Sequence, residues 1–331
     1  MATARRFDID NAKGIAILLV VFGHIVARES PADNAWYDIA RAAVYRFHMP
    51  FFMYLSGYVA GYKALGGVGR DAYPRYLSSR AVRLLVPFFA FGLVVLAGKM
   101  LAANIIHVDN RPDGLLSGLV DLFWTTRDSP SGSVWFMFCL FLFLALTPPL
   151  GWLGAGYWPH LVLGVVVFAT GLPARLYLNK AAEVAVYFAI GALAGERAER
   201  LDAPLRRLWP LAMAGFAVLL VGHDIAPGAW RGPIAVATAV LSIPAIHGAV
   251  LALHGQAPSW SAVFGKFSFA IYLLNTIAIG VAKGVMLRVM PWHGTNFLLF
   301  FPVLMLAGTA GPIIVKLTLF RLHPTLDRMT D

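Results

Sequence analysis

Charged residues and cysteine are both scarce in this sequence of 331 residues. Asp, Glu, Lys and Arg make up 13% of the chain and hydrophobic residues 59%, whereas soluble domains average roughly 25% charged residues. The single cysteine, Cys139, excludes an intramolecular disulfide and suits a small core residue. The sequence has no metal-ligand spacing, no Walker lysine and no Gly-x-Ser-x-Gly motif. These absences argue against a soluble enzyme of the metal-dependent, P-loop or α/β-hydrolase type.

The sequence contains long apolar runs, which could span a membrane. A membrane span needs roughly 17–25 mostly apolar residues, and no polar block is long enough to form a separate soluble domain. Ten segments meet or approach that length, at 14–27, 49–65, 84–104, 134–150, 160–173, 181–195, 208–222, 232–253, 263–287 and 296–320. They predict an all-α integral membrane protein with about ten transmembrane helices in one domain over residues 1–331. GxxxG spacings at Gly57/Gly61 and Gly191/Gly195 predict close helix packing.

The basic residues indicate how these segments are oriented. With a cytoplasmic N-terminus and ten crossings, sixteen of the 27 lysines and arginines lie on the cytoplasmic side and nine on the other. This excess predicts that both termini are cytoplasmic. The same loops account for the net charge of +10 without a nucleic-acid partner.

The first segment carries two ionisable residues, Lys13 and His24. They are eleven residues apart, which is about three helical turns, so both lie on one stripe, roughly 16 Å apart along the axis. If Lys13 is at the cytoplasmic boundary of a core about 30 Å thick, His24 reaches the midplane or beyond. An ionisable group at that depth is expected to face the bundle interior or a water-filled cavity. The structural alternative is a neutral histidine bonded to a neighbouring helix.

Two further stretches place basic residues at helix ends. In YRFHMPFFMYLSGY, Pro50 suits the first turn of a helix, so Arg46 and His48 lie at its outer mouth. An interfacial cap with a snorkelling arginine is the alternative there. In SSRAVRLLVPFF, Arg80 and Arg83 are i and i+3 on one face, an arrangement that suits phosphate groups. Positive-inside anchoring also predicts arginines at that position.

The remaining polar positions are weaker candidates. Trp135 lies at a helix entrance, where aromatic residues are common, and His247 falls within the eighth segment. Ser268, Tyr272 and Asn275 fall within the ninth segment.

The sequence resembles the acyltransferase-3 family of membrane-bound O-acyltransferases, including its fucose 4-O-acetylase-like branch. Five stretches carry the resemblance in order: IDNAKGIAILLVVFGH, RFHMPFFMYLSGY, RAVRLLVPFF, VWFMF and FSFAIYLLN. The most specific feature is a basic residue followed by ten residues and a histidine, here Lys13 to His24. The resemblance spans nearly the whole chain.

The resemblance implies a ten-helix acyltransferase in the bacterial inner membrane. Some relatives also carry an extracytoplasmic hydrolase-like domain, but from this sequence we expect neither a fused domain nor a metal. It implies transfer of an acyl group, usually acetyl, from cytoplasmic acetyl-CoA or another acyl-CoA to a hydroxyl group. The acceptor is commonly a cell-envelope glycan, and the lipid bilayer is the other partner; a homo-oligomer is left open. The family's essential histidine maps onto His24, its basic partner onto Lys13, and coenzyme A phosphate binding onto Arg80 and Arg83. Many members have histidine where this chain has Asn275, which puts a proton-transfer role there in doubt.

We therefore expect His24 to act as the general base, because imidazole titrates close to neutral pH. Transient acylation of His24 is the alternative within the same reaction. His48 is expected to contact the acceptor or to stabilise the oxyanion. The residues expected to line the substrate cavity are Asp10, Arg46, Trp135, Ser268, Tyr272 and Asn275. Rival functions are a transporter of a glycan, lipid or small acid and a non-enzymatic membrane sensor.

Overall fold

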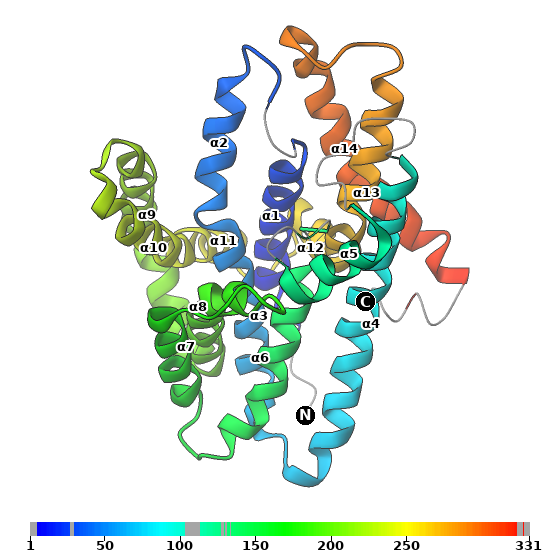
Figure 1. Cartoon of the computed structure of the whole chain (residues 1–331). Coiled ribbons are helices and arrows are strands. Elements are labelled where there is room, and N and C mark those ends of the chain that lie inside the picture. The colour runs from blue at the N-terminus through cyan, green and yellow to red at the C-terminus, as the bar shows by residue number, and fades with distance from the viewer. Residues whose placement is uncertain are drawn as a thin grey trace. The chain divides into compact units, whose positions relative to one another are not determined.

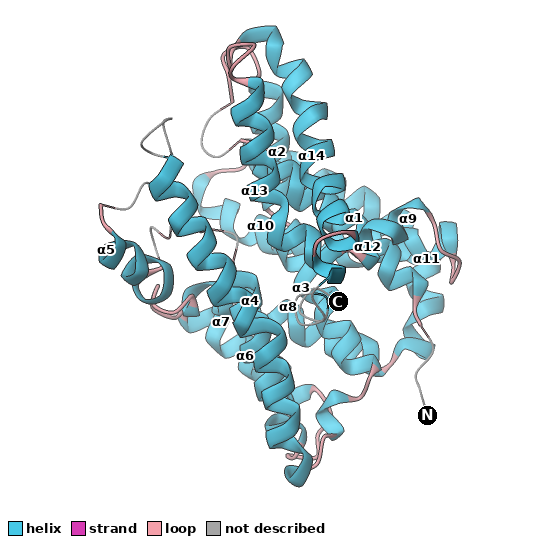
Figure 2. Ribbon diagram, turned by 90° about the vertical axis from the view of Figure 1, so that its right-hand side faces the viewer, coloured by secondary structure: helices cyan, strands magenta, loops and turns pink. Residues whose placement is uncertain are grey.

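The computed structural model describes residues 5–26, 30–102, 113–126, 129, 131–132, 134–322 and 327. All of the regular structure in these residues is helical, as Figure 2 shows. The chain forms two compact units, the first from Met1–Lys63 with Ile190–Ile313 and the second from Ala64–Ala189 with Ile314–Asp331. The all-α prediction is therefore confirmed for the described part of the chain.

The first unit contains the N-terminal helices and most of the C-terminal ones (Figure 1). Its helices are α1 (Phe7–His24), α2 (Ala35–Tyr45), α3 (His48–Tyr62), α9 (Ala198–Ile225), α10 (Gly228–Ser242), α11 (Gly248–His254), α12 (Trp260–Lys266) and α13 (Ser268–Met286). A π-helical turn, Ile243–His247, joins α10 to α11. Two more helices, α8 (Leu178–Glu196) and α14 (Phe297–Leu317), begin in one unit and end in the other.

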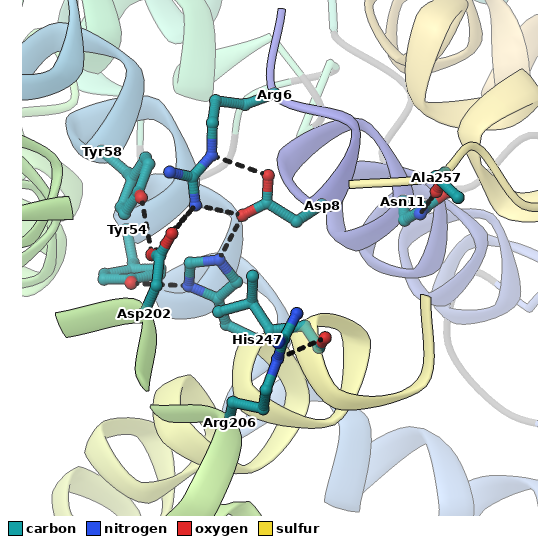
Figure 3. Close-up of polar contacts among 10 residues, drawn as sticks. Arg6, Asp8, Asn11, Tyr54, Tyr58, Asp202, Arg206, His247 and Ala257 are labelled. Atoms are coloured by element: carbon teal, nitrogen blue, oxygen red, sulfur yellow. Dashed lines mark hydrogen bonds and ion pairs between the residues drawn. The ribbon is translucent and has the colours of Figure 1, made fainter. Parts of the chain in front are cut away.

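Helix α1 packs most extensively against α12, which lies beside it in Figure 1. A Cβ atom on Gly14 would lie 1.8 Å from the Ser261 carbonyl oxygen, and one on Gly265 would lie 1.8 Å from the Asp10 carbonyl oxygen. Only glycine permits two backbones to approach this closely. The buried Asn11 amide adds hydrogen bonds, donating to the Ala257 carbonyl at 3.0 Å (Figure 3) and accepting from the Ser259 amide at 3.0 Å.

A second close approach joins α3 to the C-terminal part of α8 within the first unit. A Cβ atom on Gly61 would lie 1.9 Å from the Ala192 carbonyl oxygen. Added Cβ atoms on Gly191 and Gly195 would lie 2.0 and 2.1 Å from carbonyl oxygens of α3. The packing role predicted for the GxxxG glycines is thus confirmed at these three positions.

The second unit is built from α4 (Tyr73–Ala102), α5 (Leu115–Val120), α6 (Trp135–Gly151), α7 (Trp158–Thr170) and the N-terminal part of α8. Helix α4 packs against α6. Two tyrosine hydroxyls at the start of α4 donate to carbonyls of α6, Tyr73 to Ala145 and Tyr76 to Leu144, each at 3.0 Å. These bonds fix the register of the two helices at the end of α4 that carries Arg80 and Arg83.

Five described helical stretches are long and apolar enough to cross a membrane. They are Arg70–Leu101, Ala198–Ile225, Gly228–His254, Ser268–Met286 and Gly294–Leu322. Leu115–Thr125, Trp135–Gly151 and Trp158–Thr170 are shorter apolar helices. Each of the ten predicted segments overlaps described helical structure, but two of them do not form a single α-helix. Segment 232–253 covers α10, the π-helical turn and α11, and segment 263–287 covers α12 and α13, which are separated at Phe267. The count of ten crossings and the orientation of the termini stay predictions.

Candidate functional site

His24 is the last residue of α1, and it has a polar contact with Asn275 of α13. The His24 Nδ1 and Asn275 Oδ1 atoms are 2.7 Å apart. The Asn275 Nδ2 group lies 2.8 Å from each of the Ile271 and Tyr272 carbonyl oxygens of its own helix. Asn275 is fully buried and His24 partly so. The structure therefore brings together two predicted site residues that are 251 positions apart in the sequence.

Helix α2 holds the C-terminal end of α1 in place, a role that the sequence analysis did not foresee. Three side chains on one face of α2 donate to carbonyls at this end: Tyr37 to Phe22 at 2.6 Å, Arg41 to Val26 at 2.8 Å, and Tyr45 to Gly23 at 2.7 Å. Burial raises the pKa of Tyr37 above its ordinary value, so its hydroxyl keeps the proton that it donates. Carbonyls at a helix C-terminus lack partners within the helix, and α2 supplies them beside His24.

His48, the first residue of α3, lies at the same end of α1. Its Nδ1 donates to the Val44 carbonyl at 2.8 Å, and its ring stacks on Tyr45 with centroids 5.0 Å apart. Because Tyr45 also bonds the Gly23 carbonyl, this one tyrosine connects His48 to the residue before His24.

Other predicted site residues lie elsewhere in the first unit. Lys13 is on α1, as the helical stripe requires. Asp10 pairs with Arg5 at 2.7 Å. The Arg46 guanidinium donates to the Leu220 carbonyl at 3.0 Å and pairs with Asp224, which ties it to the end of α9.

The last predicted residues are divided between the two units. Ser268 and Tyr272 are buried on α13, where the Tyr272 carbonyl accepts from Asn275. Trp135 begins α6, and Arg80 and Arg83 lie on α4, all three in the second unit. The Arg80 Nε atom is buried and has no hydrogen-bond partner among the described residues.

A buried ionic cluster at the other end of α1 was missed by the sequence analysis (Figure 3). Asp8 accepts two hydrogen bonds from Arg6, at 2.7 and 2.8 Å, and its Oδ2 lies 3.0 Å from His247 Nε2. Arg6 also pairs with Asp202 at 2.9 Å. Tyr54 lies 2.9 Å from the other ring nitrogen of His247. The cluster joins α1, α3, α9 and the π-helical turn.

Arg6, Asp8, Asp202 and His247 each have at least one polar partner within this cluster. Burial alone would lower the pKa of Arg6, but its hydrogen bonds to Asp8 and Asp202 raise it above the ordinary value. Asp8 and His247 are both fully buried. A signal for the cluster was present in the sequence, because ionisable residues near or within apolar segments are expected to pair with one another.

No metal-binding group emerges from the part of the chain that the structure describes. There, no three His, Cys, Asp or Glu side chains gather closely enough to hold a metal ion.

Comparison with known proteins identifies a family. The family model described as an acyltransferase domain matches residues 6–317. The nodulation protein NolL of Sinorhizobium fredii is 33% identical over 150 residues, which cover 44% of this chain and 37% of that protein. NolL of Mesorhizobium japonicum is 29% identical over 140 residues, covering 42% and 34%. The matched region thus spans little more than a third of each relative, and no solved structure matches significantly.

Proposed function

Because this chain belongs to the acyltransferase-3 family, we propose that it is a membrane-bound O-acyltransferase. It moves an acyl group, with acetyl as the first candidate, from cytoplasmic acyl-CoA to a hydroxyl of a cell-envelope or exported glycan. Its proposed location is the inner membrane of a bacterium; the multiple apolar helices support a location in a membrane. The observation that carries the proposal is the match over residues 6–317, a span that contains His24 at the end of α1.

In the proposed reaction, His24 is the general base. The acceptor oxygen bonds to the acyl carbon, the bond from that carbon to sulfur breaks, and the hydroxyl proton passes to the imidazole. The leaving thiolate is then protonated by solvent or by the imidazolium. A positioned base of this kind contributes about 10²–10⁴-fold to the rate. The alternative within the same function is a transient acyl group on His24.

His48 is proposed to contact the acceptor. In a neutral imidazole only one ring nitrogen carries a proton, and the Nδ1 proton of His48 is donated to the Val44 carbonyl. Its Nε2 then accepts hydrogen bonds and does not donate them. This geometry favours an interaction with the acceptor hydroxyl over donation to an oxyanion, the other role considered for His48.

Arg80 and Arg83 are proposed to bind the phosphates of the acyl donor. Their i, i+3 spacing is retained on α4, and planar guanidinium groups bond phosphate oxygens in pairs. Buried hydrogen-bond donors normally have a partner. The buried Arg80 Nε atom has none among the described residues, which supports the binding of an anionic ligand there. Lys13 is proposed to lie on the side of α1 from which the acyl donor enters, three helical turns before His24.

The proposal is tested with purified protein in lipid nanodiscs. The protein is incubated with radiolabelled acetyl-CoA and with envelope glycans extracted from a bacterial strain that lacks the gene. We expect label on the glycan, or slow release of free acetate when the glycan is omitted. Absence of both transfer and thioester hydrolysis would contradict the proposal and favour the transporter or sensor functions.

A further inference from the structure

The side-chain amide of Asn275 is oriented by its own helix. An asparagine amide has one half that only donates, Nδ2, and one half that only accepts, Oδ1. The carbonyl oxygens of Ile271 and Tyr272 accept and cannot donate, and both lie 2.8 Å from one end of the amide. That end must therefore be the NH₂ group, whichever way the amide is drawn. The oxygen then faces His24.

The orientation of the amide decides which nitrogen of His24 carries its proton. The Asn275 Oδ1 atom lies 2.7 Å from His24 Nδ1, and because this oxygen only accepts, Nδ1 must donate. A neutral imidazole has a single N–H. The second nitrogen, Nε2, consequently carries the lone pair. Which nitrogen of a histidine is protonated is set by the hydrogen bond that the other one makes.

The surroundings hold this pair rigidly. Asn275 is fully buried, and both of its amide hydrogens are committed to carbonyls of α13. The backbone of α1 next to His24 is fixed by the Tyr45 hydroxyl on the Gly23 carbonyl. An amide neither gains nor loses a proton in the accessible pH range, so Asn275 orients the imidazole without taking part in proton transfer.

We infer that Asn275 is a positioning residue, which fixes His24 in its Nδ1–H form and presents Nε2 as the basic atom of the site. This inference rests on the proposed function only for the role of that basic atom. The geometry itself depends on three contacts within the first unit, one between α1 and α13 and two within α13.

The tautomer can be measured without any activity assay. Protein labelled with ¹⁵N-histidine is reconstituted in nanodiscs, and the His24 signals are assigned by their absence from a His24→Gln variant. We expect a protonated Nδ1 and an unprotonated Nε2 for His24. An Asn275→Leu variant of similar size should lose the Nδ1–H form, whereas Asn275→Asp, which keeps an acceptor oxygen, should retain it. Protonated Nε2 in the wild-type protein, or an unchanged tautomer in Asn275→Leu, would overturn the inference.

Kinetics give the second readout. Loss of a group that orients a metal-bound histidine typically costs about 10- to 100-fold, and we expect Asn275→Leu to lower kcat by a factor of similar size. KM for acetyl-CoA should stay near the wild-type value, since Asn275 is not proposed to touch the donor. A raised KM with unchanged kcat would contradict the positioning role. If His24→Gln kept full activity while the tautomer was as expected, the proposed role of His24 as the base would fail and the assignment of the proton would stand.

Discussion

Asp8 Oδ2 and His247 Nε2 lie 3.0 Å apart, and neither side chain is exposed. The two residues are 239 positions apart, so this contact joins the first turn of α1 to the π-helical turn after α10. The contact is reinforced by Arg6, which binds Asp8 through two hydrogen bonds. A network of this kind holds the start of α1, whose other end carries His24.

Replacing Asp8 with Asn is therefore expected to destabilise the protein. The substitution removes the negative charge at position 8. Arg6 then loses its ion pair with Asp8 and keeps the one with Asp202. Breaking a buried ion pair from one side costs about 3–5 kcal/mol. Thermal unfolding in detergent should show a clear decrease in the unfolding temperature.

Asp10→Asn is the matched control on the same helix. Its partner Arg5 is 54% exposed, and exposed ion pairs contribute about 0–1 kcal/mol. Equal destabilisation by the two substitutions would contradict a special role for the buried cluster.

The close approach of α1 and α12 gives a second prediction. A Cβ atom on Gly14 would lie 1.8 Å from the Ser261 carbonyl oxygen, so Gly14→Ala should force the helices apart. Overpacking of this kind typically costs about 1–3 kcal/mol. Gly280→Ala on α13 is the control, because nothing lies within 4 Å of its added Cβ atom. An unfolding temperature equal to that of Gly280→Ala would show that the helices do not pack as described.

Tyr45 should affect catalysis through its hydroxyl group. Tyr45→Phe keeps a ring to stack on His48 but removes the donor to the Gly23 carbonyl. Small displacements of a catalytic group can cost up to about 100-fold in rate, and we expect kcat to fall by about tenfold or more. Tyr73→Phe removes a comparable hydroxyl-to-carbonyl bond in the second unit and should leave kcat nearly unchanged. Equal kcat values for the two variants would argue against a role for α2 in holding His24.

Arg80 should affect the acyl donor more than the chemical step. A lysine cannot reproduce the paired hydrogen bonds of a guanidinium, and loss of one bond to a charged group costs about 1.5–3 kcal/mol. We therefore expect Arg80→Lys to raise KM for acetyl-CoA by about 10- to 100-fold. Arg75→Lys, at an exposed position on the same helix, is expected to leave KM unchanged. A KM for Arg80→Lys equal to that of Arg75→Lys would rule out phosphate binding by Arg80.

The helical fold and the placement of Lys13 and His24 on one helix could be predicted from the sequence, because both depend on local patterns. Apolar runs identify helices, and a spacing of eleven residues places Lys13 and His24 on one stripe of a single helix. Glycine spacing likewise predicted close helix packing at Gly61, Gly191 and Gly195, although the pairing of α3 with α8 came from the structure. Local periodicity was sufficient for each of these features.

Contacts between distant segments could not be predicted in the same way. The pairing of His24 with Asn275 depends on how α1 docks against α13, and the Asp8–His247 contact depends on the π-helical turn. Helix α2 was missed because its 11 residues are too few for a membrane span and because Asp38 and Arg41 interrupt its apolar residues. Its role in fixing the end of α1 follows only from the three carbonyls that it binds.

The most direct test of the account is the activity of purified His24→Ala protein with radiolabelled acetyl-CoA. Since a positioned general base contributes about 10²–10⁴-fold, we expect transfer to the glycan to fall by at least about 100-fold. His254→Ala, which removes an exposed histidine at the end of α11, serves as the matched control and should keep wild-type activity. Full acetyl-CoA-dependent transfer by correctly folded His24→Ala protein would contradict both the general-base and the acyl-histidine mechanisms.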